Sequence, residues 1–512
     1  MLVKSYAAAV QGISATVVTI EVSCTKGIQF FLVGLPDVAV RESHERIISA
    51  LEVNGYKFPR YRIVINMAPA DIRKEGSSYD LPLAIGILAA AGQLDSSGLS
   101  KFMMMGELSL DGSLLPIKGA LPIAIQAREE GFKGFILPRQ NACEAAVVNN
   151  LEVYGVSNIK DVIEFIQGKR KLEPTIIDTR KEFYERQQVF DCDFSDVRGQ
   201  ENVKRAMEVA AAGGHNLIMV GSPGSGKSML AKRLPTILPP FTLQESLETT
   251  KIHSVAGKIS GETSLMVQRP FRSPHHTISN VAMVGGGAYP QPGEISLAHN
   301  GVLFLDELPE FNRSVLEVMR QPLEDRRINI SRARFTVDYP AGFMLVASMN
   351  PCPCGYYNHP DRPCLCAAGA VQKYMNRISG PLLDRIDIQI EIVPVPFEKI
   401  SERQSSEPSL AIRERVIRAR SIQAERFATY EGVYCNAQMN TNLLHQYAAP
   451  DAAGLAILKT AMQRLSLSAR AYDRILKVSR TIADLEGSEF IEVRHLAEAI
   501  QYRNLDRENW GM

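Results

Sequence analysis

The sequence GSPGSGKS at residues 221–228 decides the fold of the central part of the chain. It directly follows the apolar run NLIMV and precedes MLAKRL, which predicts a buried strand, a glycine-rich turn and a helix. The glycines let backbone N–H groups surround phosphate oxygens, and the helix N-terminus adds a partial positive charge. A glycine-rich turn could match by chance, but the flanking strand and helix argue against this. We therefore expect a P-loop (Walker A motif) that binds nucleotide through Gly221, Ser222, Pro223, Gly224, Ser225, Gly226, Lys227 and Ser228.

Groups that would hold Mg²⁺ and activate water are expected on this loop and after a second apolar strand. Lys227 would neutralise the β- and γ-phosphates of ATP, and Ser228 would ligate Mg²⁺. The stretch GVLFLDELPEF at 301–311 places two acids after a buried strand. Asp306 would hold the magnesium ion, directly or through water, and Glu307 would be the general base toward the attacking water. Two adjacent acids can also merely cap a strand, which is a weaker explanation beside a P-loop.

Further polar residues follow the later strands and helices. The strand FMLVASMN ends in Asn350, whose amide can orient the water beside the γ-phosphate; a strand-end turn residue is the alternative. SGPLLDRIDI at 379–388 carries Arg385, which could reach a neighbouring subunit's phosphate or pair with Asp384 or Asp387. A nucleotide-state sensor and a solvated helix face are both possible for two arginines of the last part of the chain, Arg470 and Arg474.

Composition limits the classes of protein that need to be considered. The 512 residues are 45% hydrophobic and 22% charged, which is typical of a soluble protein of two to four domains. The net charge of +1 means that any nucleic-acid site must be a local basic patch. The longest apolar run, AIGILAAAG at 84–92, is too short to cross a membrane, and the N-terminus lacks the layout of a secretory signal. We therefore expect a cytoplasmic protein with reduced thiols.

Hydrophobic periodicity divides the chain into three blocks. Residues 1–168 mix alternating strands with helices, and the charged segment 169–190 is expected to be a linker. Residues 191–395 contain short apolar runs typical of a buried parallel sheet, so the fold class is α/β. Residues 396–512 have helical periodicity throughout.

A cysteine-rich segment follows Asn350. In the loop 351–367, two C-x-C pairs could supply four thiolates to one structural Zn²⁺: Cys352, Cys354, Cys364 and Cys366. His359 could replace one thiol, and reduced cysteines or a redox-sensitive pair are the alternatives. No catalytic role follows, because four filled positions leave no site for water.

Long motifs resemble the ComM/YifB family of bacterial magnesium-chelatase-like AAA+ ATPases: PFRSPHHTIS, GEISLAHNGVLFLDELPEF and RISGPLLDRIDI. The resemblance covers essentially the whole chain. It implies a Lon-protease-like N-terminal domain, an AAA+ core and a helical lid, in hexameric rings with ATP between subunits. It also implies that Asn350 is the sensor-one residue, Arg385 the arginine finger and Arg470 the sensor-two residue. ComM is associated with natural transformation, as a helicase that migrates branched DNA.

DNA contact is expected at the segment LEDRRINISRARFTVDYP, residues 323–340, which has four arginines between 326 and 334 and alternates like a β-hairpin. Minichromosome-maintenance helicases place a basic pore hairpin at the same point, and by that similarity Arg332 would contact DNA phosphate, with Arg334 alongside. The alternative is a charged, soluble hairpin. The long loop before the Asp-Glu strand would be a second pore element with Arg272, His275 and His276; metal binding by the two histidines is the weaker possibility.

The N-terminal block resembles the Lon-type proteolytic fold, with Ser78 near the position of the nucleophile. Leu121 and Ile123 stand at the two candidate positions of the lysine base, and Lys118 is out of register. A serine without a base is a poor nucleophile, so a protease is disfavoured. The remaining hypotheses are a DNA-translocating motor and a chelatase-type ATPase that remodels a protein or porphyrin complex.

Overall fold

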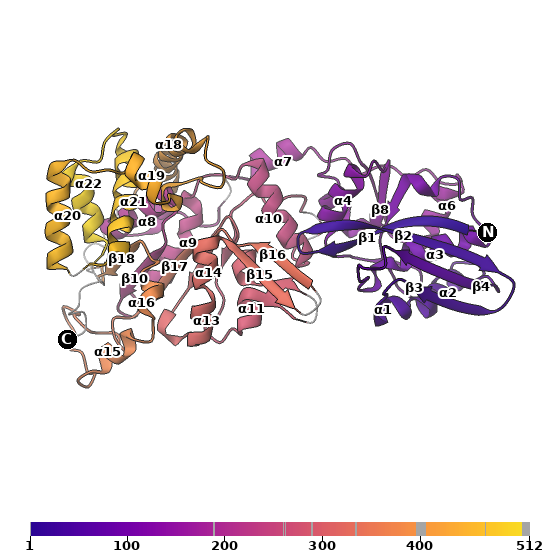
Figure 1. Ribbon diagram of the computed structural model, residues 1–512, viewed down its shortest axis with the longest axis horizontal. Coiled ribbons are helices and arrows are strands. Elements are labelled where there is room, and N and C mark those ends of the chain that lie inside the picture. The colour runs from indigo at the N-terminus through magenta and orange to yellow at the C-terminus, as the bar shows by residue number, and fades with distance from the viewer. Residues whose placement is uncertain are drawn as a thin grey trace.

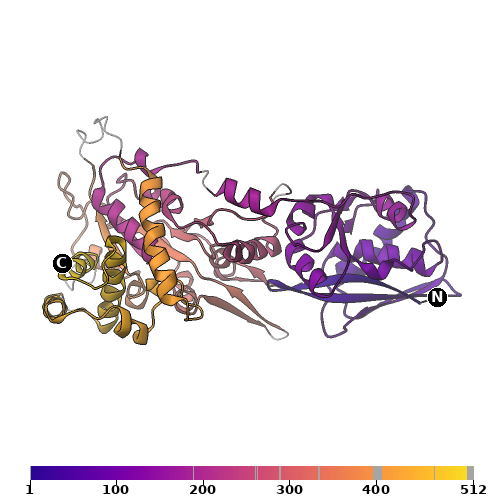
Figure 2. The ribbon, with the colours of Figure 1, turned by 90° about the horizontal axis from the view of Figure 1, so that it is seen from above.

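The computed structural model describes residues 2–187, 190–259, 261, 263–287, 290–332, 335–395, 406–465 and 467–503. The molecule is elongated, with the N-terminal block at one end and the other two blocks packed together at the other (Figures 1 and 2). None of the described helices combines the length and the apolar character needed to cross a lipid bilayer.

The N-terminal block is built on a seven-stranded mixed sheet in the order β3-β4-β2-β1-β5-β8-β9. The strands are β1 (Leu2–Gln11), β2 (Ser14–Thr25), β3 (Gln29–Val33), β4 (Arg62–Ala68), β5 (Phe102–Met104), β8 (Gly134–Pro138) and β9 (Glu152–Val156). The helices α2 (Ser43–Val53), α3 (Asp80–Ala90), α4 (Ala120–Glu129) and α6 (Ile159–Ile166) accompany it. Every residue of α3 is buried, so the most apolar run of the sequence is a core helix of this domain.

The central block contains a five-stranded sheet in the order β11-β14-β17-β10-β18, and all of its strand pairs are parallel. The strands are β10 (Leu217–Gly221), β11 (Phe271–Arg272), β14 (Val302–Leu305), β17 (Met344–Met349) and β18 (Ile388–Ile392). Every residue of β10, β14 and β17 is buried, because helices cover both faces of such a sheet. The α/β parallel fold predicted from the continuous apolar runs is therefore confirmed.

Helices surround this sheet and connect its strands. They include α8 (Glu201–Gly213), α9 (Lys227–Ile237) and α10 (Leu243–Val255). The alternating arginine-rich segment forms a two-stranded antiparallel hairpin of β15 (Arg327–Arg332) and β16 (Phe335–Pro340). The hairpin extends from the central block toward the N-terminal sheet (Figures 1 and 2).

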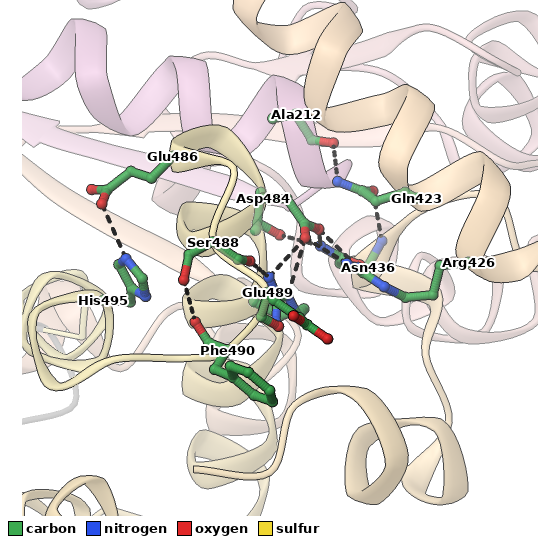
Figure 3. Close-up of polar contacts among 12 residues, drawn as sticks. Ala212, Gln423, Arg426, Asn436, Asp484, Glu486, Ser488, Glu489, Phe490 and His495 are labelled. Carbon is green, nitrogen blue, oxygen red and sulfur yellow. Dashed lines mark hydrogen bonds and ion pairs between the residues drawn. The ribbon is translucent and has the colours of Figure 1, made fainter. Parts of the chain in front are cut away.

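The C-terminal block is a helical lid formed by α18 (Ser409–Phe427), α19 (Thr441–Tyr447), α20 (Ala452–Arg464), α21 (Ala469–Glu486) and α22 (Val493–Gln501). Its apolar residues form one continuous core with those of α8, α9 and the central sheet. Buried polar groups add specific contacts inside the lid (Figure 3). The carboxylate of Asp484 accepts hydrogen bonds from Arg426, Arg480 and Asn436.

The segment expected to be a linker carries a short helix, α7 (Thr179–Arg186). The N-terminal and central blocks also touch directly. The backbone N–H of Gly119 donates to the carbonyl of Ser254 at 3.1 Å, and α4 packs against α10. In addition, Ile13 in the β1–β2 turn and Val337 of β16 both pack against the same apolar cluster of the central block.

Candidate active site

The glycine-rich loop connects the carboxyl end of β10 to the N-terminus of α9. Gly224 and Gly226 have φ values of +78° and +90°, which side chains other than glycine rarely adopt. The hydroxyl of Ser225 is buried and has no hydrogen-bond partner within the described residues. A glycine-rich turn before a helix N-terminus, with a buried hydroxyl that lacks a partner in the described part of the chain, fits the phosphate chain of a nucleotide.

Lys227 is held by three oxygen acceptors of its own domain. Its Nζ donates to the carbonyls of Gly221 at 2.7 Å and Ser222 at 2.9 Å, and to Oδ1 of Asn350 at 3.2 Å. Burial lowers the pKa of Lys227, and the nearby carboxylates of Asp306 and Glu307 oppose part of that shift. The loop and the end of β17 therefore meet at one ammonium group, as expected for neighbouring parallel strands.

Asp306 follows β14 and receives hydroxyl groups from two other elements. Ser228 Oγ donates to Asp306 Oδ2 at 2.6 Å, and Ser348 Oγ donates to Asp306 Oδ1. Ser228 and Asp306 are thus in contact and present the oxygen ligands that Mg²⁺ prefers. Ser348 was not anticipated from the sequence, although it is the one hydroxyl within the otherwise apolar strand MLVASM.

Glu307 differs from Asp306 in both backbone and exposure. Its φ of +55° turns the side chain away from the strand direction, and the side chain is 56% exposed. A carboxylate that faces solvent beside the phosphate-binding loop can accept a proton from water. His276 Nδ1 lies 3.8 Å from Glu307 Oε2, a neighbour that the sequence did not indicate.

In the loop between β11 and β14, the side chains that were expected to be pore contacts already have partners within the chain. Arg272 forms a two-point ion pair with Glu294, at 2.6 and 2.7 Å. His275 contacts Thr277, and the rings of His275 and His276 lie 4.1 Å apart. Of the two histidines, His276 is therefore the one that faces the proposed base.

The four cysteines converge directly beside the P-loop, with all four sulfur atoms within 4.8 Å of one another. The distances among Cys352, Cys354 and Cys364 are 3.3, 3.7 and 3.5 Å. Tetrahedral Zn²⁺ with bonds of about 2.3 Å would hold thiolates about 3.8 Å apart, so the donor set fits zinc. His359 instead accepts a hydrogen bond from the backbone N–H of Asp361.

The candidate finger and sensor arginines lie at the amino ends of the strands, opposite the P-loop at their carboxyl ends. Arg385 precedes β18, and the register pairs Leu217 with Ile388 at the amino ends of the strands and Gly221 with Ile392 at their carboxyl ends. A five-residue strand spans roughly 15 Å, which separates Arg385 from the P-loop of its own chain.

Neither of the intramolecular pairs considered for Arg385 is its main contact. Arg385 Nη2 lies 2.5 Å from Glu324, and its buried Nε has no partner within the described residues. Asp384 and Asp387 contact other arginines: Arg470 at 3.4 Å and Arg474 at 2.9 Å. A surface pocket of about 200 Å³, here called the finger pocket, is lined by Glu324, Asp384, Arg385, Arg470, Asp473, Arg474 and Lys477.

The remaining candidates are placed as follows. Leu121 and Ile123 are fully buried, and the stem of Lys118 lies against Gly257 at the end of α10. Ser78 lies in a short 3₁₀ helix just before α3. Arg334 and the side chain of Arg332 lie outside the described residues.

Comparison with known proteins agrees with this architecture. Three family descriptions match the chain: "Magnesium chelatase, subunit ChlI" at residues 193–400, "Subunit ChlI of Mg-chelatase" at 20–141 and "Magnesium chelatase, subunit ChlI C-terminal" at 406–503. The competence protein ComM of Haemophilus influenzae is 44% identical over 98% of this chain and 97% of its own length. The protein YifB of Escherichia coli is 42% identical over 97% and 96%. Lon protease 2 of Bacillus subtilis is 28% identical over 27% of this chain and 25% of its own length.

The P-loop with its two acids on a parallel sheet, followed by a helical lid, defines a magnesium-chelatase-type AAA+ protein, and this supports an ATPase activity. The chain belongs to the ComM/YifB family.

Proposed function

We propose that this protein is an ATP-hydrolysing ring motor that acts on DNA in the cytoplasm, as a helicase or branch-migration factor during recombination in natural transformation. The observation that carries the proposal is the separation of the two halves of the catalytic machinery. The P-loop lies at the carboxyl ends of the parallel strands, whereas Arg385 and Arg470 lie together at their amino ends. Arginines in that position can act on a phosphate only if it belongs to a neighbouring subunit.

Each chain would then contribute two faces to a shared site, with a hexamer as the expected ring. On the first face, Lys227 neutralises the phosphate charge and Ser228 with Asp306 holds Mg²⁺, which would supply further charge neutralisation when bound. Glu307 takes the proton of the attacking water, and Asn350, held at Lys227, orients that water. On the second face, Arg385 stabilises the charge of the transferring phosphoryl group and Arg470 senses the nucleotide state.

We infer that the hairpin β15–β16 contacts DNA, with Arg332 and Arg334 as the phosphate-binding residues expected from the sequence. The name of the relative that is 44% identical, competence protein ComM, supports a competence-related role. A basic hairpin on each subunit of a ring would grip single-stranded or branched DNA without sequence preference.

The alternative is a chelatase-type ATPase that remodels a protein complex. It is favoured by the three family descriptions, all of which refer to a magnesium-chelatase subunit. The two functions share the same ATP chemistry and differ only in the substrate of the ring, which is DNA in one case and a protein complex in the other.

The ATPase rate with and without forked DNA distinguishes the two. We expect DNA to stimulate the wild-type protein, and Glu307→Gln to bind ATP but hydrolyse it roughly 10²–10⁴-fold more slowly, because the proton acceptor is lost. Glu310→Gln is the matched control, since Glu310 is an exposed acid of the same segment that pairs with Arg377. Normal turnover in Glu307→Gln would refute the assignment of the base. Hydrolysis without DNA stimulation, together with no DNA binding at low salt, would favour the remodelling ATPase.

We also propose that Cys352, Cys354, Cys364 and Cys366 hold one structural Zn²⁺, because of the close approach of their four sulfur atoms. Metal analysis of the purified protein should find about one zinc per chain. The double variant Cys364→Ser/Cys366→Ser should lose the metal, whereas Cys143→Ser in the N-terminal domain should retain it. Protein purified without any bound metal would contradict the assignment.

A further inference from the structure

A second, larger cavity lies at the amino ends of the strands of the central sheet, opposite the P-loop. Its volume is about 830 Å³. Its floor is formed by residues that precede the strands: Asn216 before β10, Gly301 before β14 and Asp387 before β18. Its other wall is formed by Phe427 at the end of α18 and by the segment 428–438 that follows. We call it the amino-edge pocket. Because it opens at the amino ends of the parallel strands, it is separate from the nucleotide site at their carboxyl ends.

Two arginines of this pocket have no carboxylate partner among the described residues. Among the described residues, the one acceptor of the Arg326 side chain is the carbonyl of Gly432, at 3.3 Å. Arg420 donates to the carbonyls of Tyr434 and Ala211, at 3.3 and 3.5 Å, and its buried Nε has no partner.

Two of the acids that line the pocket already have arginine partners. Both carboxylate oxygens of Glu245 accept hydrogen bonds from Arg269, at 3.0 and 3.1 Å. Asp387 pairs with Arg474 at 2.9 Å. Arg326 and Arg420 therefore have no carboxylate ion pair among the described residues, although Glu248 and Glu431 also line the cavity and the charge of Arg420 contributes to lowering the pKa of Glu245.

The environment makes this charge costly. Burial lowers the pKa of Arg326, and burial lowers the pKa of Arg269 as well, with a contribution from Arg420. Removing a guanidinium from water without an anionic partner is unfavourable, and an anion in the same cavity would reverse that penalty.

The wall that closes the pocket is held in place by buried hydrogen bonds (Figure 3). Gln423 of α18 donates to the carbonyl of Ala212 at 3.1 Å and accepts the backbone N–H of Asn436 at 3.0 Å. The Asn436 side chain donates to Asp484 at 2.7 Å. The segment carrying Gly432 and Tyr434 is therefore anchored at Asn436, so the cavity is formed before any ligand arrives.

We propose that the amino-edge pocket binds a small phosphate-bearing ligand through Arg326 and Arg420. Guanidinium forks match the oxygens of phosphate, and the cavity volume lies in the range of sites for nucleotide-sized ligands. Phe343 and Tyr430 supply flat apolar surface beside the two cations. The phosphate could belong to a free nucleotide or to the end of a nucleic-acid strand, which share this chemistry.

A bound ligand would touch the same ion pair that borders the catalytic arginine. Arg474 lines both the amino-edge pocket and the finger pocket, whereas its partner Asp387 lines the amino-edge pocket and is two residues from Arg385. This connection to ATP hydrolysis rests on the proposed function, whereas the binding site itself does not.

The test uses full-length Lys227→Ala protein, so that the P-loop does not contribute. Calorimetric titration with inorganic pyrophosphate should detect binding, and the additional change Arg326→Gln or Arg420→Gln should each weaken it at least about tenfold. Arg418→Gln, an exposed arginine of the same helix, is the matched control and should leave the affinity unchanged. No heat of binding and no rise in Tm with pyrophosphate in the Lys227→Ala protein, or equal affinity in the Arg326 and Arg420 variants, would overturn the site.

The two phosphate sources are separated by repeating the titration with ADP and with a 5′-phosphorylated oligothymidine of two nucleotides. Tighter binding of ADP assigns the pocket to a free nucleotide, and tighter binding of the dinucleotide assigns it to a strand end. Binding of neither, with pyrophosphate still bound, would contradict a nucleotide-sized ligand. A failure of DNA to stimulate hydrolysis would refute the proposed motor without affecting these results, because the Lys227→Ala background does not depend on hydrolysis.

Discussion

Gly355 links the cysteine cluster to the phosphate-binding loop. Its φ is +84°, and a Cβ atom built on it would lie 2.5 Å from Cδ of Pro223. No side chain fits between the two loops, so the cysteine-rich segment rests directly on the P-loop. Any metal held by the cysteines would therefore stiffen the support of the nucleotide site.

Gly355→Ala should displace the P-loop because the methyl group overlaps Pro223. We expect KM for ATP to rise roughly threefold to tenfold, equivalent to about 1 kcal/mol of lost binding, with the metal content unchanged. Gly369→Ala is the matched control, since Gly369 also has a positive φ, of +77°, but its Cβ would meet no neighbour within 4 Å. Equal KM values in the two variants would show that backbone strain, not the contact with Pro223, matters.

At the scale of single residues, the candidates on the phosphate-binding loop and after β14 could be predicted because their chemistry depends on short local motifs. Lys227, Ser228 and Asp306 belong to this group, and they lie close together. The partner of Arg385 could not be predicted, because Glu324 comes from a different helix, α14 (Arg320–Asp325). His276 was noted, but only folding brings it beside Glu307.

At the scale of elements, the lid depends on buried charge. Asp484 is fully buried and lies 2.5 Å from Arg426 and 3.0 Å from Arg480. It also binds Asn436, which anchors the segment after α18. One carboxylate therefore joins α18, α21 and the wall of the amino-edge pocket.

Asp484→Ala should destabilise the protein by about 3–5 kcal/mol, because it leaves two buried guanidinium groups without their anion. Thermal or urea unfolding monitored by circular dichroism would measure the loss. Glu425→Ala, an exposed acid of α18, should change stability by less than about 0.5 kcal/mol. A similar small change in Asp484→Ala would mean that the buried network contributes little.

Elements with strong patterns could be predicted, and those without could not. The continuous apolar runs became β10, β14 and β17, because strands buried on both faces need apolar residues at nearly every position. The edge strand β18 has the sequence IQIEI, in which polar residues alternate with isoleucines. Helix α7 was missed since its sequence, TRKEFYER, is mostly charged and has little apolar periodicity. The pairing order of the central sheet also could not be predicted, as it is set by contacts between segments distant in the chain.

For the whole molecule, the separation of Arg385 from its own P-loop predicts complementation between subunits. Arg385→Ala and Lys227→Ala chains should each be inactive alone, because an arginine finger contributes roughly 10³–10⁵-fold to turnover. Mixed rings should regain part of the ATPase activity, since some interfaces would combine an intact P-loop with an intact finger. Rings that assemble from both chains and show no recovery would argue against action in trans. Arg418→Ala mixed with Lys227→Ala serves as the control for dilution of active subunits.

The contact between the β1–β2 turn and β16 has a mechanical consequence. Gly12 has a φ of +61°, and a Cβ atom on it would lie 2.9 Å from Val337, so the two hairpins meet tip to flank with no space between them. A force on the β15–β16 hairpin would be transmitted through this contact into the N-terminal sheet, which would resist displacement of the hairpin. A chain without the N-terminal domain would keep the nucleotide site but would lose this support of the hairpin.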